Sequence, residues 1–302
     1  MSTEDKIGVN IDCRNPSQTA NYIMKEMVVA KAESGFLKVL TLGTMAGVFI
    51  GFGGEISTLA GHDGLGFMGY GATRVLAGAV FSLGLMLVII AGAELFTGNT
   101  LIFGAVLEKK VSIKTLLKNW LLVYCANFVG SVLLAFLVFY SGTWQQNDLL
   151  VGAYALKIGV TKVNLTTVEI LTRGILCNCL VCLAIWMASA SRNVVGKILA
   201  IFFPIMAFVA LGYEHCVANM FFIPKAMLLA TRPDVVAMSH LTPDKLANLT
   251  MLGFAKNLLP ATLGNVIGSV GFLVTLYWLA YVKKKAPVSN FEKGFGQSSG
   301  NL

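Results

Sequence analysis

The chain has 302 residues, of which 56% are hydrophobic and only 13% are charged, and its mean hydropathy is +0.74. A soluble domain carries about 25% charged residues, so this composition excludes an ordinary soluble protein and predicts an all-α integral membrane protein. The net charge of +8 comes mostly from lysine and arginine placed between apolar runs, and it calls for no nucleic-acid partner.

In chain order, the first element is a polar region, residues 1–36, in which Asn15-Pro16-Ser17 predicts a helix start. The mixed charges that follow predict an amphipathic helix on the membrane surface. Six apolar runs then predict six transmembrane helices in a channel domain over residues 37–285, since each run can cross about 30 Å of hydrocarbon. The runs cover residues 39–60, 73–106, 116–140, 168–190, 198–230 and 251–282. The last segment, residues 286–302, is rich in Gly and Ser and is expected to be a disordered tail.

The distribution of lysine and arginine predicts the orientation of the chain. These residues gather in segments 1–38, 107–118, 191–197 and 283–293, and they are sparser between those segments. Cytoplasmic loops carry the excess of positive side chains. Both termini are therefore expected in the cytoplasm, with the chain in the plasma membrane as a multi-pass protein.

The second and fifth runs contain the same motif, Gly-x-Glu followed five residues later by Asn. The two copies are Gly92-Ala93-Glu94 with Asn99, and Gly212-Tyr213-Glu214 with Asn219. Placing a carboxylate within hydrocarbon costs about 2.5–3.5 kcal/mol even on the translocon-insertion scale, which gives the lowest values. Two glutamates at matched positions therefore indicate a function. Both runs are also long for one crossing, which predicts broken helices. A break in lipid is tolerable only beside a protein-lined pathway.

A second repeat relates the halves of the chain, residues 37–141 and 165–285. Asn119 and Asn127 in the third run are spaced as Asn257 and Asn265 are in the sixth. Each half has an odd number of predicted spans, so the second half must enter the membrane from the opposite side. The pattern predicts an inverted repeat with a pathway between the halves near the midplane.

Five segments together resemble the formate/nitrite transporter family, above all its bacterial formate-channel branch, over about residues 20–285. These segments are 81–85 (FSLGL), 92–100 (GAELFTGNT), 119–120 (NW), 212–220 (GYEHCVANM) and 257–265 (NLLPATLGN). The resemblance implies an aquaporin-like fold with six spans and a homopentameric assembly. It also implies a separate pore in each protomer for small monovalent anions or their acids, with no cofactor and no enzyme activity.

His215 is the candidate central residue of the pathway, because it is the one histidine of three that falls within an apolar run. A buried imidazole can hydrogen-bond an anion and exchange a proton with it, and a structural histidine is the alternative. The resemblance places Thr97 opposite His215. It also places Asn178 and Asn265 near the pore wall, where packing between helices is the alternative.

Lys162 precedes the fourth run and matches the vestibule segment of the family. An ammonium there raises the local concentration of anions, and a solvated loop lysine is the alternative. The family pattern further assigns bulky apolar residues to constrictions, which favour small substrates and disfavour hydrated ions. They are Leu85, Leu95 and Val181 on the cytoplasmic side and Phe81 and Phe208 on the outer side, with Phe96 counted among them for its bulk.

Glu94 and Glu214 would repel an anion if they faced it. We therefore expect them to accept hydrogen bonds from backbone N–H groups freed at the breaks, as a scaffold that also includes Asn99 and Asn219. Cys177, Cys179 and Cys182 lie close together but lack a second ligand cluster, so no metal site is expected.

The expected function is passive or proton-coupled passage of formate through a channel. Nitrite, hydrosulfide, lactate and acetate are alternatives for the same pore. A water or glycerol channel would share the inverted plan, but the Asn-Pro-Ala pairs of such channels are absent from the sequence. A membrane enzyme or receptor would need a cofactor cluster or a large soluble domain, and the sequence shows neither.

Overall fold

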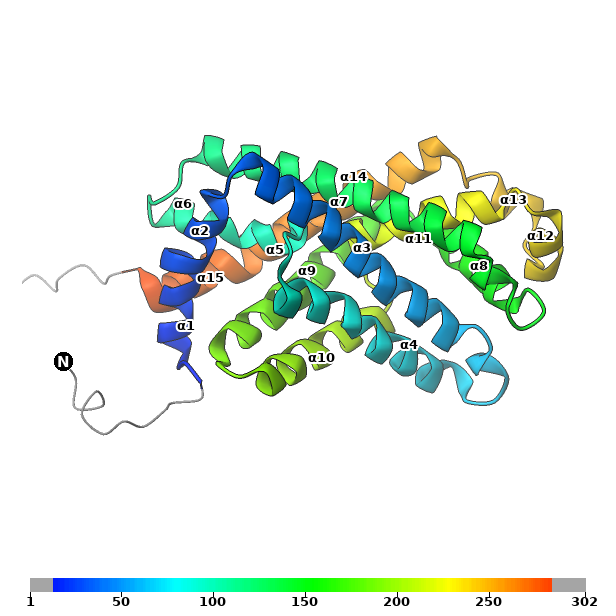
Figure 1. Cartoon of the computed structure of the whole chain (residues 1–302), viewed down its shortest axis with the longest axis horizontal. Coiled ribbons are helices and arrows are strands. Elements are labelled where there is room, and N and C mark those ends of the chain that lie inside the picture. The colour runs from blue at the N-terminus through cyan, green and yellow to red at the C-terminus, as the bar shows by residue number, and fades with distance from the viewer. Residues whose placement is uncertain (1–12, 284–302) are drawn as a thin grey trace, which may run out of the picture.

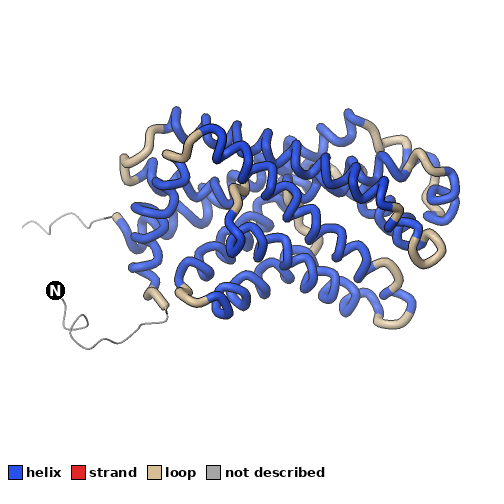
Figure 2. The backbone as a smooth tube through the Cα atoms, viewed as in Figure 1, coloured by secondary structure: helices blue, strands red, loops and turns tan. Residues whose placement is uncertain are grey.

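The computed structural model describes residues 13–283, and this part of the chain is helical with short connections (Figure 1, Figure 2). Within these residues there is no β-strand, only an isolated bridge between Cys13 and Ser191. The all-helical class predicted from composition is confirmed. The expected tail, residues 286–302, lies outside the described residues.

Five helical segments are long and apolar enough to cross a membrane. Two of them are single helices, α7 (Ile113–Ser141) and α9 (Thr167–Ala190). Two more are Phe36–Gly66, made of α3 (Phe36–Gly61) and η3 (Gly64–Gly66), and Gly69–Gly92, made of α4 (Gly69–Met86) and η4 (Leu87–Gly92). The last, Met251–Val282, consists of α14 (Met251–Ile267), η7 (Gly268–Val274), α15 (Thr275–Tyr277) and η8 (Trp278–Val282). A rise of about 1.5 Å per residue lets roughly 20 residues span the hydrocarbon, and each segment exceeds that length. Large apolar side chains such as Leu121 and Leu259 stay exposed, as on a surface that faces lipid.

Both copies of the Gly-x-Glu motif lie where a helix stops. The segment of α4 and η4 ends at Gly92, and α5 (Phe96–Asn99) begins after a short extended stretch. It continues through η5 (Thr100–Ile102) into α6 (Phe103–Leu107). Likewise α10 (Val194–Ala210) stops before Gly212, and α11 (Cys216–Leu229) begins after it. Gly92 has φ +90° and Gly212 has φ +72°, a conformation that L side chains rarely adopt, which explains the glycine in both copies.

The two halves repeat the same helix packing. α3 packs against α4 and α7, and α9 packs against α10 and α14. A Cβ added at Gly130 of α7 would stand 1.9 Å from the Thr44 carbonyl oxygen of α3. One added at Gly268, directly after α14, would stand 2.1 Å from the Ile175 oxygen of α9. Each helix pair therefore needs a glycine at its closest approach.

The N-terminal region packs on the bundle. α1 (Pro16–Tyr22) is capped by Asn15 and continues through η2 (Ile23–Met27) into α2 (Val28–Ala32), as Figure 1 shows at the N-terminal end. Its apolar side chains Ile23, Met24 and Val28 are fully buried in a cluster that includes Leu101 of η5. The apolar face that we expected to lie on the membrane surface is thus covered by protein.

The opposite end of the molecule is formed by α8 (Leu150–Val163), α12 (Pro233–Ser239) and α13 (Pro243–Leu246) (Figure 1). A short η6 turn (Thr143–Gln145) leads from α7 toward α8. Leu156 and Val160 of α8 bury themselves against Leu229 of α11 and Val235 of α12. This packing fixes the last turn of α8, and with it Lys162.

The matched glycines give a test of the repeated packing. Gly130→Ala and Gly268→Ala each place a methyl group against a backbone oxygen that cannot move away, so each should lower the free energy of unfolding by at least about 1–3 kcal/mol, the usual cost of overpacking. Gly71→Ala in α4 is the control, since a Cβ there meets nothing within 4 Å. Thermal unfolding in detergent micelles measures the difference. Equal stability of all three variants would contradict the packing.

Candidate functional site

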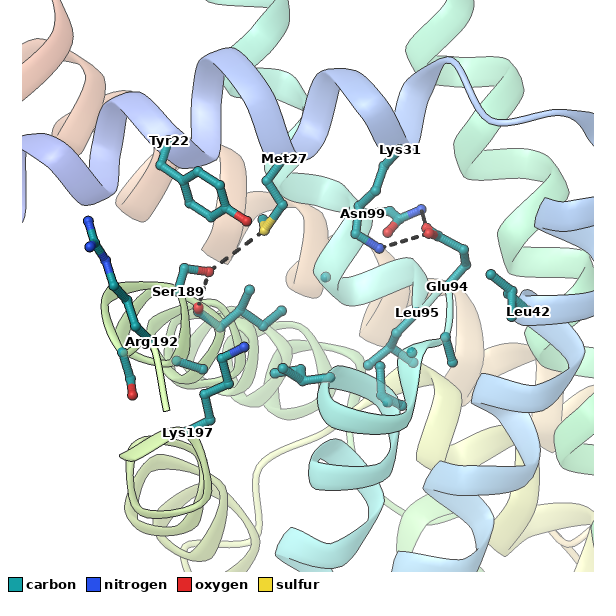
Figure 3. A pocket seen from close by; sticks show the side chains of 18 of the residues that line it. Tyr22, Met27, Lys31, Leu42, Glu94, Leu95, Asn99, Ser189, Arg192 and Lys197 are labelled. Carbon is teal, nitrogen blue, oxygen red and sulfur yellow. Dashed lines mark hydrogen bonds and ion pairs between the residues drawn. The ribbon is translucent and has the colours of Figure 1, made fainter. Parts of the chain in front are cut away.

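Two cavities enter the molecule from opposite ends. The first, which we call the Lys31 vestibule, has a volume of 530 Å³ and lies among α1, α2, α9, α10 and the break after η4 (Figure 3). Its wall includes the basic residues Arg14, Lys31, Lys38, Arg192 and Lys197. The second, the Lys162 vestibule, has a volume of 480 Å³ and includes Arg74, Lys157, Lys162 and Arg173. Each vestibule has one glutamate in its wall, so the positive charges predominate and favour anions.

A third space, of only 10 Å³, lies between the two vestibules and shares wall residues with each. Its wall consists of Ile50, Phe81, Leu85, Leu95, Val181, Ile205, Phe208 and His215. Leu95 also lines the Lys31 vestibule, while Phe81, Phe208 and His215 also line the Lys162 vestibule. The three spaces therefore form one path with a single narrow, almost wholly apolar section, which we call the constriction.

Five of the six residues expected at constrictions line this space, and Phe96 does not. The Phe81 and Phe208 rings meet edge to face with centroids 5.7 Å apart. Phe96 is the first residue of α5, and its ring packs edge to face against Tyr124 of α7, 5.0 Å between centroids. Its direction is set by the start of α5, which turns the side chain toward α7 instead of the path.

His215 is the one polar side chain in the wall of the constriction, and its two ring nitrogens have different partners. It is the N-cap residue of α11, where Nδ1 accepts the backbone N–H of Ala218 at 3.1 Å. An accepting Nδ1 carries no proton, so the neutral ring carries its proton on Nε2. Nε2 lies 2.8 Å from the Thr97 hydroxyl oxygen and donates to it. The predicted pair thus meets across the two breaks.

Thr97 is held from behind by buried donors. Its carbonyl accepts from the Thr100 hydroxyl at 2.5 Å and from Asn178 Nδ2 at 3.3 Å. Asn178 also donates to the Asn265 carbonyl at 2.7 Å and is fully buried. It therefore ties the two breaks together behind the constriction, rather than lining the path.

At the first break, Glu94 lies in a small buried network. Its carboxylate accepts from Lys31 Nζ at 2.9 Å and from Asn99 Nδ2 at 2.7 Å, and Figure 3 shows both side chains directed at it. Asn99 Nδ2 also donates to Asn119 Oδ1 at 3.0 Å, and Asn119 donates to the Lys31 carbonyl at 3.4 Å. The network ties the N-terminal region, the break and α7 together.

The second break repeats this network. Glu214 accepts from Lys162 Nζ at 2.8 Å and from Asn219 Nδ2 at 2.6 Å. Asn219 donates to Asn257 Oδ1 at 2.7 Å, and Asn257 donates to the Lys162 carbonyl at 3.0 Å. Each partner in the first network has a counterpart here, so the sequence repeat is also a repeat of contacts.

The backbone at the first break is satisfied by Asn127 of α7. Its Oδ1 accepts the Phe96 N–H at 2.8 Å, while its Nδ2 donates to the carbonyls of Gly43 at 2.8 Å and Glu94 at 2.9 Å. Because the extended stretch cannot form helical hydrogen bonds, this one amide replaces two of them, and its third bond ties the break to α3.

Asn265 of α14 does the same at the second break. Its Oδ1 accepts the Cys216 N–H at 2.9 Å, and its Nδ2 donates to the carbonyls of Gly174 at 2.8 Å and Glu214 at 2.9 Å. Asn265 is completely buried and, like Asn178, stands behind the path.

The way in which the glutamates were expected to act is wrong in one respect. We expected Glu94 and Glu214 to accept the backbone N–H groups freed at the breaks. The N–H groups that follow the breaks bond instead to Asn127 and Asn265, and those of the two glutamates bond to carbonyls of α3 and α9. The two carboxylates accept from lysine and asparagine side chains instead. Their charge is thereby paired with an ammonium, which removes most of the repulsion that they would exert on an anion.

Lys31 was not among the site residues predicted from the sequence motifs. It belongs to a polar helix that looks peripheral in sequence, yet its ammonium reaches the first break. The repeat did contain a signal. The same interval separates Lys31 from Gly43 and Lys162 from Gly174, the two glycines whose carbonyls bond to Asn127 and Asn265.

The ion pairs at the breaks give a second test. Lys31→Gln leaves the Glu94 carboxylate, 7% exposed, without its cation, and should cost about 2–3 kcal/mol of unfolding free energy, somewhat below a fully buried pair because Lys31 is partly exposed. Adding Glu94→Gln should recover a part of that loss, since no charge is then unpaired. Lys38→Gln, which removes a cation without a carboxylate partner among the described residues, is the control. A double variant less stable than Lys31→Gln would refute the assignment. Thermal and denaturant unfolding in micelles provide the values.

Comparisons with known proteins agree with this geometry. The sequence profile of a family described as formate/nitrite transporter matches residues 18–279. The probable formate transporter of Methanothermobacter thermautotrophicus is 37% identical over 287 residues, which cover 90% of this chain and 98% of the relative. The formate channel FocA of Escherichia coli K12 is 36% identical over 266 residues, which cover 87% and 93%.

A solved structure agrees as well. A pentameric formate channel with formate bound matches with a TM-score of 0.74 and 35% identity, covering 82% of this chain and 98% of that one. The profile match, the relatives and the membrane-length helices together confirm the resemblance seen in the motifs. The chain belongs to the formate/nitrite transporter family and is a multi-pass membrane transport protein, not an enzyme.

Proposed function

We propose that this protein is a formate channel. The observation that carries the proposal is the path itself, in which two cation-lined vestibules meet at an apolar constriction whose wall has His215 as its one polar side chain. The formate transporter and formate channels to which the chain is similar support the choice of substrate.

The proposed membrane architecture has six crossings. Five are the membrane-length helical segments, the second of which is extended past its break by α5 and α6, and the remaining one joins α10 to α11 across the Gly212 break. The inverted halves, about residues 37–141 and 165–285, are supported by the matched networks at the two breaks. In this arrangement the Lys31 vestibule opens to the cytoplasm, both termini are cytoplasmic, and the protein lies in the plasma membrane. A solved structure that matches the chain is a pentameric formate channel, which supports a homopentamer.

The constriction favours a small anion that can shed its charge. Phe81, Leu85, Leu95 and Phe208 leave no room for a hydration shell, and removing a charged group from water is costly without a partner. At this point the Nε2–H of His215 is the donor in reach, because it needs only to exchange its Thr97 partner for the anion. Formate passes either with this hydrogen bond or as the neutral acid.

Proton coupling through His215 has a structural consequence. A second proton can enter the ring only at Nδ1, which accepts the Ala218 N–H in the neutral ring. Protonation therefore breaks the cap of α11, since two donors cannot bond to one another. When His215 becomes charged, the start of α11 at the second break is therefore released. Proton binding is thereby coupled to a change in the conformation of the path.

His215→Asn tests this coupling. Asparagine is also a favourable N-cap acceptor, so α11 keeps its start, but an amide cannot take up a proton at these pH values. We expect formate uptake by wild-type proteoliposomes to rise several-fold as the pH is lowered over the range in which the protein stays folded, and uptake by the variant to stay near its neutral value. Empty liposomes correct for acid that crosses the lipid. Identical pH profiles for the two proteins would rule out coupling through His215.

The width of the constriction gives a test of substrate choice. Leu95→Ala removes a side chain shared by the constriction and the Lys31 vestibule, so the ratio of lactate to formate uptake should rise about tenfold. Leu134→Ala removes the same volume from the packing of α7 against α11, away from the path, and should leave the ratio unchanged. Radiolabelled uptake of both acids measures the ratio. A constant ratio in Leu95→Ala would show that the constriction does not select by size.

A further inference from the structure

Two of the four basic residues of the Lys162 vestibule are already paired with carboxylates. Lys162 Nζ lies 2.8 Å from Glu214, and Arg173 lies 3.5 Å from Glu169. Among the described residues, Arg74 and Lys157 have no carboxylate within 4 Å, although both line this vestibule. An arriving anion therefore meets two cations whose charge is not locally compensated, and Arg74 is the one that the fold holds in place.

Arg74 belongs to α4, but its guanidinium is bonded to the end of α10. Nη2 donates to the Val209 carbonyl at 2.6 Å, and Nε donates to the Ala210 carbonyl at 3.2 Å. These are the last two carbonyls of α10, and only that of Val209 also accepts a backbone N–H, from Gly212 at 3.0 Å. The guanidinium holds the end of α10 and is itself fixed by it, and the Tyr154 hydroxyl in the wall of the same vestibule is a further acceptor beside it. Its remaining N–H groups have no acceptor among the described residues.

The guanidinium lies at the rim of the constriction. Nη2 would stand 3.3 Å from a Cβ built on Gly212, three positions before His215. Phe208, in the same last turn of α10, and Phe81, two turns along α4 from Arg74, form the aromatic side of the constriction. A group bound to the remaining N–H groups would thus lie in the Lys162 vestibule, on its way to the Phe81–Phe208 contact.

The inverted repeat does not duplicate this feature. Val194 takes the place of Arg74 in the other half, since both residues precede the glycine of their motif by the same interval. The Arg74 contacts are therefore a departure from the symmetric scaffold, as His215 is. Departures of this kind are where the two vestibules differ in how they receive an anion.

We propose that Arg74 is an anion-binding residue at the mouth of the constriction, where it receives the carboxylate of the substrate while it holds the last turn of α10 that carries Phe208. The proposal rests on the anion-channel function proposed above. A planar guanidinium suits a carboxylate because parallel N–H groups can bond to both oxygens. The Lys162 ammonium, by contrast, is paired with the Glu214 carboxylate, so Lys162 acts mainly as part of the scaffold at the second break.

Three variants in proteoliposomes test the proposal through the concentration dependence of radiolabelled formate uptake. Arg74→Gln should raise the half-saturating concentration about tenfold and leave the maximal rate within about twofold, because a charge-assisted hydrogen bond to the anion is lost. Arg74→Lys, which keeps the charge without the parallel donors, should raise it about threefold. Lys245→Gln removes a cation from α13 at the same end but away from the path, and should match wild type.

The outcomes separate binding from scaffolding. An Arg74→Gln variant that loses maximal rate at an unchanged half-saturating concentration would overturn the proposal and leave Arg74 as a cap of α10 only. Equal half-saturating concentrations in Arg74→Gln and Lys245→Gln would also overturn it. Should Arg74→Gln not assemble, Arg74→Lys decides, and an unchanged half-saturating concentration there refutes anion binding.

The test also distinguishes this proposal from the proposed function. Wild-type protein that carries nitrite but not formate would refute formate as the substrate, and the same variants would then be compared with nitrite. Nitrite is likewise a planar anion with two oxygens, so the expected order of the variants stays the same. A shift for neither anion in the Arg74 variants would refute the binding role alone.

Discussion

The structure depends on one constraint: within hydrocarbon, every backbone polar group needs a partner from the protein. The two breaks beside the path free several such groups at once. Asn127 and Asn265, each on a neighbouring helix, supply an acceptor and donors to the freed N–H and carbonyl groups. Because each amide serves both sides of a break, the chain can leave helical geometry at two places without exposing its backbone to lipid. The path exists because these hydrogen bonds offset the free-energy cost of the two breaks.

The same device occurs twice, and the chemistry of the path comes from where the copies differ. His215 occupies the position of Leu95, and Thr97 occupies the position of Val217, counted from the glycine of each motif. Each half thus contributes one polar side chain to the centre and one apolar side chain. Had both halves contributed the same kind, the centre would be either wholly apolar or a pair of like groups. The asymmetry produces one hydrogen bond, 2.8 Å long, inside an otherwise apolar wall.

The sequence was sufficient for features that are local or repeated. Composition predicted the helical class, and the positive φ of Gly92 and Gly212 shows why the motif glycines mark the ends of helices. Contacts between segments far apart in the chain could not be predicted from the sequence. Lys31 meets Glu94 across 63 positions, and Arg74 meets Val209 across 135, so neither pairing leaves a local pattern. Phe96 was assigned to the path from its bulk, but its direction depends on where α5 starts.

The two buried ion pairs allow carboxylates to stand beside an anion path. Glu94 and Glu214 each bind a lysine ammonium, so the scaffold adds little net charge at the centre while the vestibules stay positive. An anion is then attracted up to the constriction but finds no fixed positive charge within it to trap it. The polar side chain there, His215, is neutral while its Nδ1 caps α11. A proton that charges this ring must also release the cap, so charge in the constriction can appear only together with movement at the second break.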